Sequence, residues 1–151
     1  MNPSDSSSPA APDWGDAASL SDEQLAGQRL MVGFDGTELG VELRRSIREH
    51  KAGGIVLFSR NIEKPVQLAR LCADVQGFAA QCGQPPLLVA IDQEGGEVAR
   101  LPEPFTRFPG NPHMVSEADA DRFARITAAE LKGAGVNMNL APVLDIAPKA
   151  A

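Results

Sequence analysis

The sequence has few cysteines and few histidines, and both shortages limit the disulfides and metal sites that it could form. It contains two of each in 151 residues. Cys72 and Cys82 lie ten positions apart on one predicted helix, too far along the axis to pair, so both are expected to be small core residues. Neither His50 nor His113 has a Cys, Asp or second His at metal-ligand spacing. The residues therefore predict no disulfide, no histidine-based metal site and no cofactor.

Long apolar runs and clusters of basic charge are also missing. No apolar run approaches the roughly 20 residues of a transmembrane helix, and the first residues lack the features of a signal peptide. The formal net charge is -6, and the closely spaced Arg44, Arg45 and Arg48 are flanked by Glu42 and Glu49. We therefore expect a cytoplasmic protein that binds neither membrane nor nucleic acid, with a neutral ligand as the better fit.

The composition is that of a soluble globular domain preceded by a short polar segment. Hydrophobic residues make up 43% and charged residues 23% of the chain. Residues 1–18 are rich in Ser, Pro, Asp and Ala, which predicts a disordered leader. Ser21 and Gln24 have the spacing of a capping box, so the first helix is expected there, at the start of a domain over residues 19–151.

Apolar runs of strand length alternate with helical patterns over the rest of the chain. Strands are predicted at 29–34, 55–58, 87–91 and 136–140, and helices at 38–50, from Pro65 to Cys82, and from Ser116 to Gly133 or Gly135. This alternation predicts an α/β fold with a parallel sheet and helices outside it. Four such strands could form a small open domain or half of an eight-stranded barrel. A complete barrel of that kind needs about 250 residues.

Polar residues follow three of the predicted strands, at the end where ligands bind in α/β folds. They are Arg60, the pair Asp92 and Glu94, and Asp145. Asp92 precedes a Gly-Gly pair and could accept two hydrogen bonds from adjacent hydroxyls of a ligand, or it could cap a tight turn. Asp145 could orient a neighbouring basic residue or cap a loop. For Arg100, the residues alone favour an ion pair with Glu94 or Glu97.

Three segments carry a resemblance to a known family. Gly53–Asn61 (GGIVLFSRN), Leu88–Gly96 (LVAIDQEGG) with Arg100, and Leu140–Asp145 (LAPVLD) resemble consecutive blocks of the family 3 glycoside hydrolases. The DQEGG block is similar to that of the β-N-acetylhexosaminidase branch. The resemblance covers nearly all of 20–145 and implies that residues 19–151 are the N-terminal half of a TIM (β/α)8 barrel, a truncated catalytic domain.

The resemblance also implies an activity and a set of residues. The activity is hydrolysis of terminal N-acetylglucosamine O-glycosidic bonds with retention of configuration and without a metal. Asp92 matches an aspartate that binds hydroxyls of the non-reducing sugar, and Arg100 matches an arginine of the same subsite. Glu94, Asp145 and Arg60 are expected close to these two.

No catalytic residue of the family matches a position in this sequence. The nucleophile, an aspartate near a later strand, and the acid/base, a histidine past the fourth strand, are expected to lie outside it, so this chain is expected to be inactive alone. Two features depart from the family pattern. Glu97 replaces a common arginine and is expected to disturb sugar binding at Asp92, and Pro112-His113 interrupts a stretch that usually holds small apolar residues.

Two other functions are compatible with the residues. The chain could be a non-catalytic sugar-binding or assembly half-barrel that pairs with another polypeptide. It could instead be a magnesium-dependent α/β enzyme with Asp92, Glu94 and Asp145 as oxygen ligands.

A half-barrel would also leave sheet edges and an inner face open. Ile55, Leu57 and Val89 are expected to point toward the missing interior. We therefore expect self-association or a loosely packed monomer.

Overall fold

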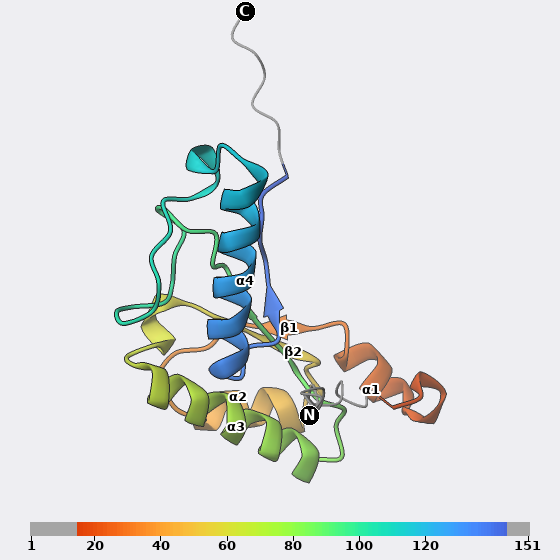
Figure 1. Ribbon diagram of the computed structural model, residues 1–151. Coiled ribbons are helices and arrows are strands. Elements are labelled where there is room, and N and C mark those ends of the chain that lie inside the picture. Colours follow the sequence, from red (N-terminus) through yellow and green to blue (C-terminus); the bar gives the residue numbers. More distant parts are fainter. Residues whose placement is uncertain (1–14, 145–151) are drawn as a thin grey trace, which may run out of the picture.

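A computed structural model describes residues 15–144, and these form one four-stranded parallel sheet with helices on one side (Figure 1). The strands are β1 (Met31–Val32), β2 (Gly54–Leu57), β3 (Leu88–Ile91) and β4 (Met138–Asn139). Their order in the sheet is their order in the sequence, and every neighbouring pair is parallel. The predicted alternation of strands and helices is therefore confirmed, although β1 and β4 are shorter than predicted.

The predicted helices are present, although α2 is shorter than the predicted range 38–50. They are α1 (Asp22–Gly27), α2 (Val41–Arg48), α3 (Pro65–Gln81) and α4 (Glu117–Gly133), with short 3-10 helices η1 (Ala17–Ser19), η2 (Ser59–Asn61) and η3 (Asn111–His113). Ser21 and Gln24 form the predicted capping box of α1, and Ser116 forms a second one with Asp119 at α4. Pro65 starts α3, where its missing N–H costs no hydrogen bond.

The predicted leader lies mostly outside the described residues. The first described element, η1, begins at Ala17, within the last two residues assigned to that leader.

The hydrophobic core lies between one face of the sheet and helices α2, α3 and α4. Its buried residues include Leu43 and Ile47 of α2, Leu68, Leu71 and Val75 of α3, and Leu131 of α4. From the sheet it includes Val89 and the side chains that point the same way, Ile55, Leu57 and Ile91. In Figure 1, α2 and α3 lie side by side along the sheet, and α4 runs beside β4.

The prediction that Ile55, Leu57 and Val89 face a barrel interior is wrong. All three have no exposed surface and pack in the helix-covered core. The opposite face carries the alternate residues Met31, Val56, Leu88, Ala90 and Met138, which follow the same register across the four strands. Ala90 is buried and the other four are half-buried, so this inner face is the one that helices leave uncovered.

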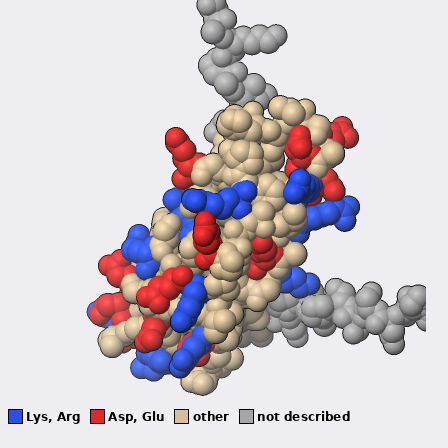
Figure 2. Space-filling view, turned by 60° about the vertical axis from the view of Figure 1, so that its left-hand side comes forward, with Lys and Arg blue, Asp and Glu red and all other residues tan. Residues whose placement is uncertain are grey.

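Charge on the surface is mixed in sign. On the face drawn in Figure 2, basic and acidic side chains are interspersed and no large basic field forms. Exposed ion pairs at helical i,i+4 spacing join Arg45 to Glu49 and Arg125 to Asp121. Among residues 15–144, no helix is both long and apolar enough to cross a membrane.

Candidate functional site

Asp92 and Arg100 meet at the carboxyl end of β3. Asp92 directly follows the strand on the side of Ala90, the inner face of the sheet. Its Oδ2 lies 3.3 Å from Nη2 of Arg100, and the two side chains are 25% and 27% exposed. The pair is therefore partly shielded from water yet open to a ligand on the inner face.

The expected ion pair of Arg100 with Glu94 or Glu97 is wrong. The chain makes a tight turn after Glu94, where the backbone N–H of Glu94 donates to Val98, and this turn brings Arg100 back to Asp92. Glu97 is exposed at the turn itself. Among residues 15–144, no backbone N–H donates to the Asp92 carboxylate, so the structure does not show the turn-capping role considered for it.

Two glycines make this turn possible. Gly95 has a φ of +85°, which side-chain-bearing residues rarely adopt, and a Cβ there would lie 3.0 Å from the backbone nitrogen of Gly110 and the carbonyl oxygen of Phe108. The backbone N–H of Gly96 donates to that same carbonyl. The turn after β3 thus packs closely, backbone to backbone, against the loop that precedes α4, and a hydrogen bond joins the two loops.

Phe58 joins the two arginines of the site, a role that the sequence analysis missed. Its ring centre lies 4.6 Å from Cζ of Arg60 and 5.9 Å from Cζ of Arg100, within cation-π range. Phe58 follows β2 on the same face as Val56, so it stands at the mouth of the inner face. An aromatic residue at the end of a buried strand, two positions before an arginine, is the signal that could have identified it.

Gln93 and Asn139 were also missed, and both organise the backbone around Arg100. The buried Gln93 side chain accepts hydrogen bonds from the backbone N–H groups of Arg100 and Leu101. Asn139 of β4 makes two bonds to the backbone of Gln93. The available signal was a pair of asparagines, Asn137 and Asn139, at alternate positions of an apolar strand.

The other predicted residues are more peripheral. Arg60 is half exposed, donates to the carbonyl of Phe34 and pairs with Asp35 at 2.8 Å, so Phe58 is its link to Arg100. Glu94 is partly exposed in the turn. Asp145 lies outside the described residues. Within 15–144 no three His, Cys, Asp or Glu side chains are grouped as a metal site would require, and Asp92 already has a cationic partner.

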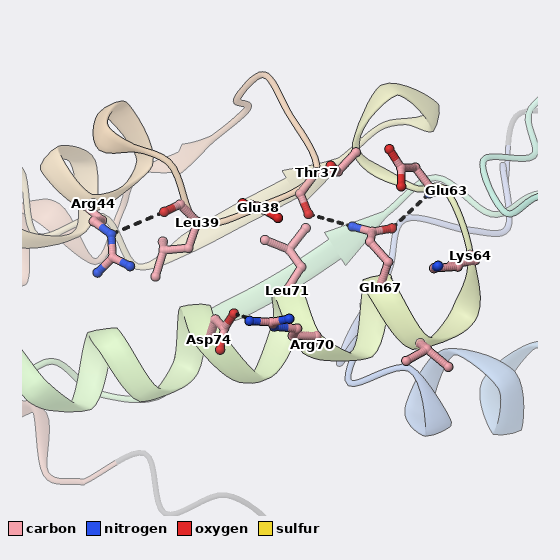
Figure 3. Close-up of a pocket in the computed structure, with 11 residues that line it drawn as sticks. Thr37, Glu38, Leu39, Arg44, Glu63, Lys64, Gln67, Arg70, Leu71 and Asp74 are labelled. Carbon is pink, nitrogen blue, oxygen red and sulfur yellow. Dashed lines mark hydrogen bonds and ion pairs between the residues drawn. The ribbon is translucent and has the colours of Figure 1, made fainter.

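A separate cavity of about 520 Å³ lies on the helical side of the molecule (Figure 3). Its wall is formed by residues before and within α2 and α3, among them Arg44, Gln67, Arg70 and Asp74, and Gln67 donates to the carbonyl of Thr37 across it. It includes neither Asp92 nor Arg100. This cavity is therefore distinct from the strand-end site.

Comparison with known proteins identifies the family to which this fold belongs. The sequence model described as the glycosyl hydrolase family 3 N terminal domain matches residues 22–151. A protein named beta-hexosaminidase from Pseudomonas aeruginosa is 37% identical over 121 residues, which is 78% of this chain and 35% of that protein. A family 3 β-N-acetylglucosaminidase structure from Paenibacillus is 43% identical with a TM-score of 0.81, covering 84% of this chain and 25% of that one.

NagZ from Neisseria gonorrhoeae, solved with N-trifluoroacetyl-D-glucosamine, is 30% identical with a TM-score of 0.67 and covers 78% of this chain and 36% of that one. The fold is that of the N-terminal half of a (β/α)8 barrel. The chain belongs to glycoside hydrolase family 3, in its β-N-acetylhexosaminidase branch. It spans about a third of the length of the Pseudomonas relative.

Proposed function

We propose that this chain forms the N-terminal part of a retaining β-N-acetylhexosaminidase, in which Asp92 and Arg100 bind the terminal N-acetylglucosamine. The observation that carries the proposal is the partly exposed pair of Asp92 and Arg100, 3.3 Å apart at the carboxyl end of β3. A carboxylate accepts two hydrogen bonds from adjacent sugar hydroxyls, and a guanidinium donates several to a hydroxyl or acetamide oxygen.

Binding by this pair does not by itself produce hydrolysis. Retention requires two catalytic groups flanking the anomeric carbon, in the usual case carboxyl groups about 5–5.5 Å apart. Asp92 is paired with Arg100, an arrangement suited to holding sugar hydroxyls. We therefore expect the 151-residue chain alone to bind sugar weakly and not to hydrolyse it. A cytoplasmic location also remains a prediction.

The test joins this chain to the remaining part of the Pseudomonas aeruginosa relative and assays a chromogenic β-N-acetylglucosaminide. The joined protein should hydrolyse it, and Asp92→Ala should lower kcat/KM about 100-fold, corresponding to a loss of about 3 kcal/mol from charged hydrogen bonds. Asp121→Ala is the matched control, because Asp121 makes an exposed ion pair on α4. It should leave the rate unchanged.

Two results would contradict the proposal. One is turnover by the 151-residue chain that persists after contaminating host enzymes are removed. The other is an Asp92→Ala variant of the active joined protein with the same kcat/KM as its parent.

A further inference from the structure

Arg100 is held at two points by two consecutive residues. Asp92 contacts its guanidinium, while the Oε1 of Gln93 accepts hydrogen bonds from the backbone N–H groups of Arg100 at 2.8 Å and Leu101 at 3.2 Å. The side chain of Gln93 is almost completely buried, with 4% of the residue exposed. The end of β3 therefore fixes both the backbone and the side-chain tip of Arg100.

Gln93 is itself fixed by the neighbouring strand. The Oδ1 of Asn139 accepts from the backbone N–H of Gln93 at 3.0 Å, and the Nδ2 of Asn139 donates to the carbonyl of Gln93 at 3.1 Å. These two hydrogen bonds, between the side-chain amide of Asn139 and the backbone N–H and C=O of Gln93, fix the orientation of Gln93. They extend the pairing of β3 with β4 beyond Ile91, the last paired residue of β3.

The guanidinium of Arg100 depends on this support because its own contacts are few. Its Nε is buried and has no hydrogen-bond partner among the described residues, its Nη2 is 3.3 Å from Asp92, and Phe58 lies 5.9 Å away. A long side chain loses rotamer entropy when it is held in one place, so a fixed backbone origin reduces the number of conformations that must be excluded.

We propose that Gln93 is a positioning residue for Arg100, supported by Asn139. By holding the backbone N–H groups of Arg100 and Leu101, Gln93 keeps the guanidinium beside Asp92, on the inner face where a sugar would bind. The binding of sugar by Arg100 rests on the proposed function. The positioning of Arg100 by Gln93 can be measured in the absence of any sugar.

The test uses NMR of the 151-residue chain and follows the side-chain Nε–Hε signal of Arg100. In the native protein this buried group should exchange slowly with solvent. Gln93→Met removes the acceptor at similar size and should accelerate that exchange about tenfold or more. Gln93→Glu retains an acceptor oxygen and should restore slow exchange. The matched control is the Nε–Hε signal of Arg125, which pairs with Asp121 on α4 and should be the same in all variants.

An Arg100 signal that stays as protected in Gln93→Met as in the native chain would overturn the positioning role. Failure of Gln93→Glu to restore protection in a folded protein would also overturn it. If Gln93→Met does not fold, Asn139→Ala decides the question, because it removes the two bonds that hold Gln93. Faster exchange at Arg100 alone would support the proposal, and unchanged exchange would refute it.

Addition of N-acetylglucosamine separates this inference from the proposed function. The sugar should shift the Arg100 signal of the native chain, and Gln93→Met should need about tenfold more sugar for the same shift. A native chain in which the sugar leaves Arg100 unchanged would contradict the sugar role of Arg100. The exchange measurement would still decide whether Gln93 positions it.

Discussion

The turn after β3 gives the sharpest test of how the loops build the site. Gly95 has a φ of +85°, and an added Cβ would lie 3.0 Å from two backbone atoms of the loop at 108–110. Gly95→Ala should therefore cost about 1–2 kcal/mol for the left-handed backbone and a similar amount for the crowding, about 2–4 kcal/mol in total. Because folded proteins are stable by only about 5–15 kcal/mol, this loss is large.

The matched control is Gly77→Ala in the middle of α3, where a Cβ would meet nothing within 4 Å and φ is not positive. Alanine favours the helix there, so this variant should gain about 0.5–1 kcal/mol. Urea unfolding followed by far-ultraviolet circular dichroism measures both changes. Neutral surface substitutions change the free energy of unfolding by up to about 0.5 kcal/mol. A Gly95→Ala variant whose free energy of unfolding lies within that range of the native value would refute the claim that close backbone contact holds the two loops together.

Three further predictions follow from other parts of the fold. Burial raises the pKa of the Cys72 thiol to about 12, so a thiol reagent at pH 8 should label the partly exposed Cys82 while Cys72 reacts only after unfolding. Because the pKa of Cys72 is raised in the folded protein, the free energy of unfolding should be unaffected by this thiol below about pH 9 and should fall as the pH rises toward 12. The fall due to Cys72 is at most about 1.4 kcal/mol per pH unit. Cys72→Ala should remove that part of the fall, as measured by urea unfolding at each pH. The fully buried side chain of Asn61 accepts a hydrogen bond from the N–H of Phe58 and donates to the carbonyls of Phe34 and Gly36. Asn61→Ala should therefore lower the free energy of unfolding by about 3 kcal/mol in the same assay. A loss below about 1 kcal/mol would contradict this structural role. The uncovered inner face and the open edges of β1 and β4 should produce dimers or larger species in light scattering, and a monodisperse monomer with one sharp unfolding transition would argue against this.

The sequence by itself was sufficient for the features that depend on near neighbours. The capping boxes at Ser21 and Ser116 join residues three positions apart, and Pro65 marks the start of α3. The four apolar runs predicted the strands because each is bounded by turn residues or helical patterns. The parallel arrangement of these elements could be predicted without tertiary information, since helical crossovers between successive strands favour a parallel sheet.

Tertiary structure alone decided which face of the strands meets the helices and which partner Arg100 takes. Ile55 and Val89 lie in runs that are apolar on both faces, as in covered parallel strands, so no alternation distinguished the two sides. Arg100 reaches Asp92 only because the glycine turn reverses the chain, and Gln93 is held by Asn139 from 46 residues away. Such contacts form when distant strands align in register, and no local sequence pattern specifies them.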